Sequence, residues 1–195
     1  MTTVMTPPET QPTPHLLEVR IELARIKPTI WRTVLLPETI TLPKLHKVIQ
    51  AVMGWEDYHL HAFEIAGERY GVPDPDFDFG HSVRNEQRVR LLRALKGTKT
   101  LRYTYDFGDD WEHLIKIERR HPPDPVSTTP RCIGGANANP PEDVGGEPGY
   151  AHFVAAMADP CHRAHSDMLA WHGSAFDPSA FDLAAINRRL QSIRF

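Results

Sequence analysis

Two neighbouring segments with alternating apolar side chains constrain the fold of this chain most strongly. They cover residues 101–108, LRYTYDFG, and residues 111–120, WEHLIKIERR. Side chains two residues apart share one face of a strand, so both segments are predicted to be strands with an apolar face. That face is expected to hold Leu101, Tyr103, Tyr105, Phe107, Trp111, His113, Ile115 and Ile117. The intervening Gly108, Asp109 and Asp110 suit a tight turn, so the pattern predicts an antiparallel hairpin.

Further strands are predicted before this hairpin and helices after it. Alternation predicts strands over residues 15–25, 29–36 and 59–71, the last with a turn at Gly67. Helical spacing predicts a helix that starts at Thr41 and stops at Gly54. It also permits helices over 83–96, 149–158 and 162–172, and over a last stretch starting at Asp177 or Ser179.

Two segments are expected to be loops, residues 72–80 and the long Pro/Gly-rich residues 121–148. Strands clustered ahead of helices favour an α+β fold that ends in a helical segment. Residues 1–14 contain four prolines and are predicted to form a flexible tail, leaving residues 15–195 as a single domain.

The composition points to a cytoplasmic protein with no membrane partner. No apolar run approaches the roughly 20 residues of a membrane helix, and the first residues lack the pattern of a secretory signal. The two cysteines, Cys132 and Cys161, imply no disulfide framework.

The charge does not favour a nucleic-acid partner. The net charge is −3 and the isoelectric point about 6.4, whereas phosphate contacts demand a basic face. The nearest candidate is a loose basic segment of Arg84, Arg88, Arg90, Arg93, Lys96 and Lys99. A solvated helix face explains this segment about as well as DNA contact does.

Four separated motifs occur in order: LHKVIQAVMGWEDYHLHAFEI, YTYDFGDDWEHLIKIE, PPEDVGGEPGY and AWHGSAFDPSAFDLAAINRRL. Together they resemble the plasmid pRiA4b ORF-3-like family, whose members are often labelled TnpR-like passenger proteins of bacterial insertion elements. The resemblance runs from about Leu17 to the C-terminus. It implies an α+β, roll-like domain with a mixed β-sheet and packed helices, and almost nothing about biochemical activity.

The third motif departs from the family pattern. Members of the family often have cysteine where this chain has Asn139 and Val144. A zinc site built from those thiolates with Cys132 would have lost most of its ligands here, which argues against such a site in this loop.

The TnpR label suggests a resolvase, but the residues do not fit one. A serine recombinase needs a nucleophilic serine near its start among arginines, and the first serine here is Ser82. A tyrosine recombinase needs a late tyrosine, and none follows Tyr150. Recombinase catalysis is therefore excluded by either route.

The acids of the hairpin form the first candidate site. Asp106, Asp109 and Asp110 with His113 could bind a divalent metal or act as acid and base. The structural alternative is favoured, in which the carboxylates crowd at a turn and His113 is a core histidine. Alternation places Asp106 on the face opposite Tyr105.

Histidines form two further candidate metal sites. His59 and His61 would share a strand face, and His46 from the preceding helix could complete a three-nitrogen site. His162 and His165 lie in a stretch where Cys161, His165, Met168 and His172 follow one helical stripe, near Asp167. Ordinary packing explains both patterns, and it is favoured over metal binding.

The motif PPEDVGG is predicted to form a rigid acidic loop. Its glycines allow turns closed to other residues, and Asp143 can hold such a turn by accepting backbone hydrogen bonds. Glu142 has no such structural role, so it is the stronger functional candidate. Near the hairpin, this loop would make an anionic groove that suits a cation, a basic peptide or a metal-bound ligand.

Three hypotheses follow. The favoured one is a non-catalytic accessory or binding protein of mobile-element origin, whose acidic loop and hairpin recognise a protein or a cationic ligand. The second is a metal-dependent, hydrolase-like enzyme that uses Asp106, Asp109, His113 and Glu142, with histidines from elsewhere in the chain. The third is a DNA-associated regulator that uses the arginines of residues 84–93. The cofactor that these candidate sites would bind is a divalent metal ion.

Overall fold

The computed structural model describes residues 13–73, 83–124 and 130–193. Most of the predicted loop 72–80 and the first twelve residues of the predicted tail lie outside these ranges. Within them, eight strands form one sheet in the order β5-β4-β3-β6-β7-β1-β2-β8. All neighbours pair antiparallel except β4 and β5, so the sheet is mixed. The predicted α+β class with a mixed sheet and a C-terminal helix is confirmed.

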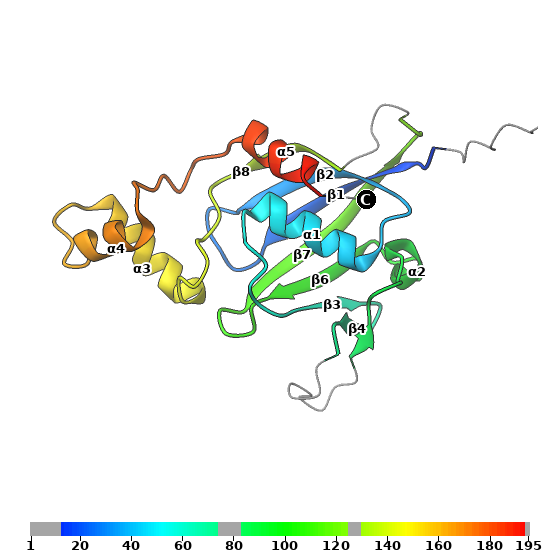
Figure 1. Cartoon of the computed structure of the whole chain (residues 1–195), viewed down its shortest axis with the longest axis horizontal. Helices are drawn as coiled ribbons and strands as arrows, with labels where there is room; N and C mark the ends of the chain where they lie inside the picture. Colours follow the sequence, from blue (N-terminus) through cyan, green and yellow to red (C-terminus); the bar gives the residue numbers. More distant parts are fainter. Residues whose placement is uncertain (1–12, 74–82, 125–129, 194–195) are drawn as a thin grey trace, which may run out of the picture.

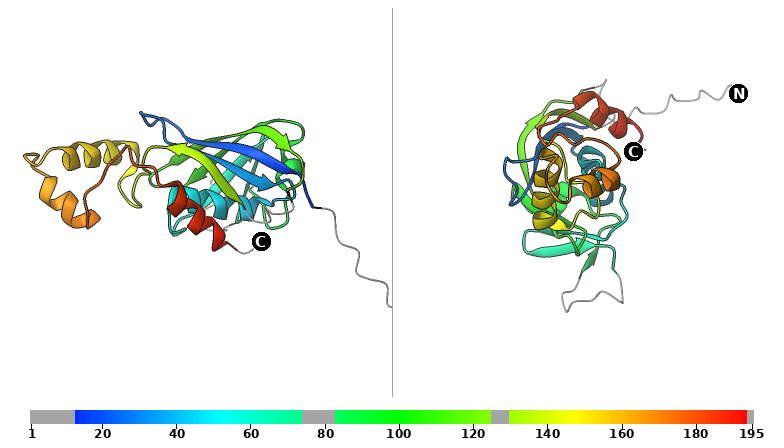
Figure 2. Two further views of the ribbon diagram at one scale, coloured as in Figure 1. Left: turned by 90° about the horizontal axis from the view of Figure 1, so that it is seen from above. Right: turned by 90° about the vertical axis from the view of Figure 1, so that its left-hand side faces the viewer.

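The strands are β1 (Leu16–Leu23), β2 (Trp31–Pro37), β3 (His61–Ile65), β4 (Glu68–Gly71), β5 (Arg84–Asn85), β6 (Thr100–Tyr105), β7 (Trp111–His121) and β8 (Arg131–Ala136). The helices are α1 (Leu42–Met53), α2 (Leu91–Leu95), α3 (Gly146–Ala158), α4 (His165–His172) and α5 (Leu183–Gln191). Helix α1 crosses one face of the sheet with α5 beside it, while α3 and α4 extend beyond one end of the sheet (Figures 1 and 2).

The core lies between the sheet and α1. On β1 the predicted alternation is confirmed, because Leu17, Val19, Ile21 and Leu23 are all buried. Helix α1 buries its apolar stripe against this face and ends at Gly54, whose φ of 81° lets its N–H reach the carbonyl of Gln50. No helix among the described residues is long and apolar enough to cross a membrane.

The β6–β7 hairpin forms as predicted, but its turn is longer than expected. Tyr105 pairs with Trp111, so residues 106–110 form the turn. Asp106 and Asp110 there have φ values of 57° and 55°. Because the strand alternation stops at Tyr105, Phe107 is not buried as predicted; it is 37% exposed and contacts the guanidinium of Arg69.

Two segments have a different structure from the one predicted, because their local composition gives only a weak signal for it. The expected loop 121–148 contains β8, an edge strand whose Gly134 and Gly135 weaken any strand signal. The side-chain amide of Asn187 caps this edge, accepting from the N–H of Cys132 and donating to its carbonyl. In residues 83–96 only α2 is helical, and β5 pairs parallel with β4.

The last helix also begins later than predicted. The side chain of Asp182 caps α5 by accepting from the N–H of Ala185 at 2.8 Å. Asp177 instead holds a separate turn with Ser179.

A buried arginine fixes the chain as it leaves β8. Arg32 is 3% exposed, and its guanidinium donates to the carbonyls of Val52, Ala136 and Asn137 at 3.1, 2.9 and 2.9 Å. Burial lowers its pKa to about 10, so the group remains charged at neutral pH. Arg32 therefore ties the end of α1 to the start of the acidic loop.

Candidate functional site

The acidic loop, residues 138–145, is docked on the β6–β7 turn. The indole of Trp55 donates to the carbonyl of Pro140 at 3.0 Å. The N–H of Gly145 donates to the carboxylate of Asp109 at 3.1 Å. Gly146 has a φ of 66°, and a Cβ there would lie 2.7 Å from the carbonyl oxygen of Asp109, so glycine is required for this approach.

Aromatic rings form the floor beneath the loop. Trp55 stacks on Tyr105 and on Trp111, with ring centroids 5.0 and 6.1 Å apart. These side chains come from the end of α1 and from the predicted apolar face of the hairpin. Their burial gives the acids above them a rigid support.

Glu142 reaches inward from the loop. Its Oε1 accepts from the backbone N–H of Glu56 at 2.8 Å and from the hydroxyl of Tyr105 at 3.1 Å. Burial, and then the neighbouring Glu142 carboxylate, raise the pKa of Tyr105, so its hydroxyl keeps the proton that it donates. That hydroxyl also accepts from the N–H of Tyr58 at 3.0 Å. Oε1 is thus fully engaged, whereas Oε2 is shielded from solvent and makes no hydrogen bond with the described residues.

Asp106 is held by its own turn. Its Oδ1 accepts from the backbone N–H groups of Gly108 and Asp109 at 2.8 and 3.3 Å. The residue is 7% exposed. Its positive φ ends the strand and turns the carboxylate toward the acidic loop, so Asp106 joins a cluster that strand alternation had not predicted.

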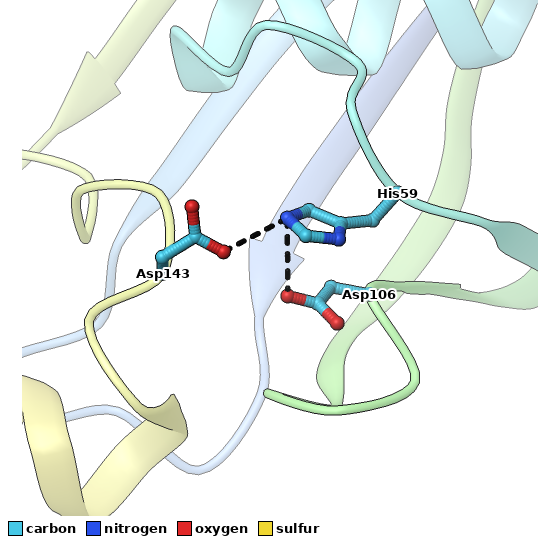
Figure 3. Close-up of side chains that lie close together, drawn as sticks. All are labelled: His59, Asp106 and Asp143. Carbon is cyan, nitrogen blue, oxygen red and sulfur yellow. Dashed lines mark ion pairs between the residues drawn. The ribbon is translucent and has the colours of Figure 1, made fainter.

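His59 is the point on which these acids converge (Figure 3). Its Nε2 lies 3.0 Å from Asp143 Oδ1, 3.6 Å from Asp106 Oδ2 and 4.0 Å from Glu142 Oε2. One ligand atom each from His59, Asp106 and Asp143 lie within 4.8 Å of one another. Three acidic side chains therefore face one imidazole at this point.

The other predicted hairpin residues point elsewhere. Asp110 pairs with Arg25 at 2.9 Å, and Asp109 binds the backbone of Gly145 as described above. His113 is fully buried beneath Tyr103 and the edge of Trp55, as the favoured structural alternative proposed. Burial lowers the pKa of His113 to about 4, so it is a neutral core residue.

The predicted three-histidine site does not assemble. The rings of His46 and His61 stack at 3.7 Å, but His46 contacts Asp57 and Tyr103 while His61 contacts Glu86. Burial, and then the neighbouring His61, lower the pKa of His46 to about 4. His59 lies outside β3, which begins at His61, so the rule that places residues two apart on one face does not apply to it.

The histidines of the α3–α4 connection do not gather around a common point either. Nδ1 of His162 accepts from the N–H of Ala164, and Nδ1 of His165 lies 2.8 Å from the carbonyl of Ala156. The free Cys161 is exposed in the same connection. Each of these histidines has a local backbone partner, as the packing alternative requires.

Comparison with known proteins places this arrangement in a family. Residues 15–185 match the family described as plasmid pRiA4b ORF-3-like protein. The chain belongs to the plasmid pRiA4b ORF-3-like family. It is 39% identical over 182 residues to the uncharacterized protein y4hQ of Sinorhizobium fredii (strain NBRC 101917 / NGR234), which covers 91% of this chain and 92% of that protein.

A crystal structure extends the comparison to the fold. Protein MM3350 of unknown function from Methanosarcina mazei Go1 is 34% identical, with a TM-score of 0.78, over 88% of this chain and 97% of that one. Neither relative carries an assigned activity in its name.

The family motifs converge in space. The first of the four quoted motifs supplies Trp55 and His59, the second Tyr105 and Asp106, and the third Glu142 and Asp143. Sequence reasoning had selected each acid, but it had grouped His59 with the wrong partners. The set of separated motifs could have indicated that His59 and the acids lie together. No single spacing between residues indicates it.

Proposed function

We propose that this member of the pRiA4b ORF-3-like family is a non-catalytic binding module whose ligand is cationic. The ligand site consists of His59, Asp106, Glu142 and Asp143, referred to below as the acidic notch. The convergence of three carboxylates on one imidazole supports the proposal best. The side chain of Asp143 is 65% exposed, so a ligand can reach the notch from solvent.

The geometry gives less support to the enzymatic alternative. That hypothesis places Asp106, Asp109, His113 and Glu142, with other histidines, at one reaction centre. Of these groups, only Asp106 and Glu142 meet a histidine at the notch, and that histidine is His59. His113 is buried in the core, and the carboxylate of Asp109 is engaged with the acidic loop. An acid and a base must both reach the substrate. His113 and Asp109 do not face a common site on the surface, so they cannot act as such a pair.

A DNA partner is also less well supported. In the basic segment, Arg84 and Lys96 both pair with Glu68, at 3.1 and 2.6 Å, which reduces the positive charge that a phosphate backbone would meet. The acidic notch would itself repel phosphate.

The setting of the module is also part of the proposal. A mobile-element association rests on what the family resemblance implies and on the plasmid origin in the family's description. A cytoplasmic location fits the free thiols of Cys132 and Cys161, which are unpaired in the structure, as expected in a reducing compartment.

Calorimetric titration of the full chain tests the function. The probes are spermidine, an oligolysine peptide, Mn²⁺ and a DNA duplex, each added to the wild type, Asp143→Asn and Asp110→Asn. We expect at least one cationic probe to bind, and Asp143→Asn to weaken that binding while Asp110→Asn does not. The proposal fails if no cationic probe binds, or if the duplex binds better than all of them.

A further inference from the structure

We infer that the acidic notch is a binding site for one divalent first-row transition-metal ion, with His59 Nε2, Asp106 Oδ2 and Asp143 Oδ1 as the protein ligands and Glu142 Oε2 beside them. The inference rests on the proposed function, and it narrows a cationic ligand to a metal.

The distances between the ligand atoms of the notch suit a single metal ion. Ligand atoms about 2.0–2.2 Å from one ion lie roughly 3 to 4.4 Å from each other. The separations of Asp143 Oδ1 and Asp106 Oδ2 from His59 Nε2, 3.0 and 3.6 Å, fall in this range, and the three ligand atoms all lie within 4.8 Å of one another. The donors come from three separate segments, and Figure 3 shows the carboxylates of Asp106 and Asp143 both facing the same nitrogen of the His59 ring. An ion at their centre requires only small side-chain movements.

The second argument comes from polar atoms without a partner. Nε2 of His59 and Oε2 of Glu142 are both shielded from solvent, and neither makes a hydrogen bond of good geometry within the described part of the chain. Asp143 Oδ1 lies 3.0 Å from this nitrogen of His59, but the pair does not form a hydrogen bond of good geometry. Buried polar atoms normally find partners. An ion in the notch would give Nε2 of His59 such a partner, and Oε2 of Glu142 lies 4.0 Å from that nitrogen, close to the same positive charge.

The third argument is that the other oxygens of these groups are already fixed. Oε1 of Glu142 and Oδ1 of Asp106 accept backbone and hydroxyl hydrogen bonds. These bonds orient each carboxylate so that its second oxygen faces the notch. Hydrogen bonds to the remote atom of a ligand are the usual support of a metal site.

The donor set selects the class of metal. One imidazole nitrogen with carboxylate oxygens suits Mn²⁺, Fe²⁺ or Zn²⁺, whereas Ca²⁺ prefers six to eight oxygens. Thiolates do not contribute, because Cys132 lies in β8 and Cys161 lies in the α3–α4 connection. The exposed side of Asp143 leaves room for water to complete the coordination.

Equilibrium dialysis with metal analysis tests the inference. The full chain is freed of metal with EDTA and dialysed against Mn²⁺ or Zn²⁺, as wild type and as His59→Gln, Asp143→Asn and Asp110→Asn. Asp110→Asn is the matched control for Asp143→Asn, since it removes the same carboxylate charge from the β6–β7 turn, at a residue that pairs with Arg25 outside the notch. Circular dichroism checks the fold, and the exposed Asp143 provides a variant that does not disturb the core.

We expect about one equivalent of ion per wild-type chain. Loss of a supporting residue around a metal already costs about 10- to 100-fold in affinity, so His59→Gln and Asp143→Asn should each weaken binding at least tenfold. Asp110→Asn should bind as the wild type does. Equal weakening in Asp110→Asn would show diffuse charge attraction and overturn the inference.

The two proposals fail separately. If spermidine or oligolysine binds at the notch while neither metal does, the metal site is wrong and the cationic-ligand function stands. If none of the cations binds, both are wrong.

Discussion

Asn139 lies in the acidic loop, and its side-chain amide has no partner among the described residues. Both its Nδ2 and Oδ1 are shielded from solvent and make no hydrogen bond with the described residues. An unsatisfied buried polar group costs about 1–3 kcal/mol, so the acidic loop carries a local destabilisation at this residue.

Replacing this amide should stabilise the protein. Asn139→Ala is expected to raise the free energy of unfolding by about 1 kcal/mol, since it removes the unsatisfied atoms and only a few packing contacts. Asn137→Ala is the control. This variant loses the hydrogen bond from the Asn137 side chain to the carbonyl of Thr29, 2.8 Å long. Asparagine also tolerates the φ of 68° at this position better than alanine does, so Asn137→Ala should lower the free energy of unfolding. Urea unfolding measures both, and destabilisation by Asn139→Ala would contradict the expectation.

Single residues also mark where sequence reasoning stops being reliable. Alternation correctly placed Tyr103, Tyr105 and Trp111 in the core, because burial follows the period of a strand. It failed at Asp106 and Phe107, because the positive φ of Asp106 ends the strand two residues early. Such a φ depends on what the turn contacts, and the sequence around it does not record those contacts.

At the scale of elements, the acidic loop is positioned by its two ends rather than by its own residues. Arg32 and Trp55 hold its start, and the contact between Asp109 and Gly145 holds its end. The loop could be predicted to be rigid from its prolines and glycines. The contact of the loop with the β6–β7 turn could not be predicted. Strand β8 leads into the loop and so positions it, but the glycine-rich sequence of β8 does not indicate a strand.

Removing the arginine anchor should loosen this arrangement. Arg32→Met leaves four carbonyl oxygens, the fourth being that of Trp31, without their shared donor. We expect a loss of about 3 kcal/mol or more in the free energy of unfolding. The exposed Arg119→Met should change it by less than about 0.5 kcal/mol. Urea unfolding distinguishes the two, and equal effects would mean that the buried guanidinium is not an anchor.

At the scale of the whole molecule, one sheet gathers segments that lie far apart in the chain. Strand β3 lies between β4 and β6, and β1 lies between β7 and β2. This order brings the segment before β3, which carries His59, together with the β6–β7 turn and the segment after β8 at one end of the sheet. The α+β class followed from the order of the elements, but the strand order did not, because many arrangements are compatible with the same alternation.

The same core makes the whole fold sensitive to acid. The pKa of His113 falls from 6.5 to about 4 on burial, so the unfolded chain takes up a proton at a pH where the native state does not. Stability should therefore be lost as pH falls from about 6.5 to 4, at up to roughly 1.4 kcal/mol per pH unit for this residue.

His46 shifts in the same direction and adds to the loss. Urea unfolding at several pH values between 7.5 and 5 checks this dependence. His113→Leu should show a shallower dependence than the wild type, and an unchanged slope would rule out His113 as a source of it.

The central claim, a transition-metal ion in the acidic notch, is tested most directly by anomalous diffraction from crystals of the full chain soaked in Mn²⁺. We expect one strong anomalous peak about 2.0–2.2 Å from His59 Nε2 and from the facing oxygens of Asp106 and Asp143. A notch without a peak in such crystals, or a peak only at other acids such as Asp109 or Asp110, would contradict it.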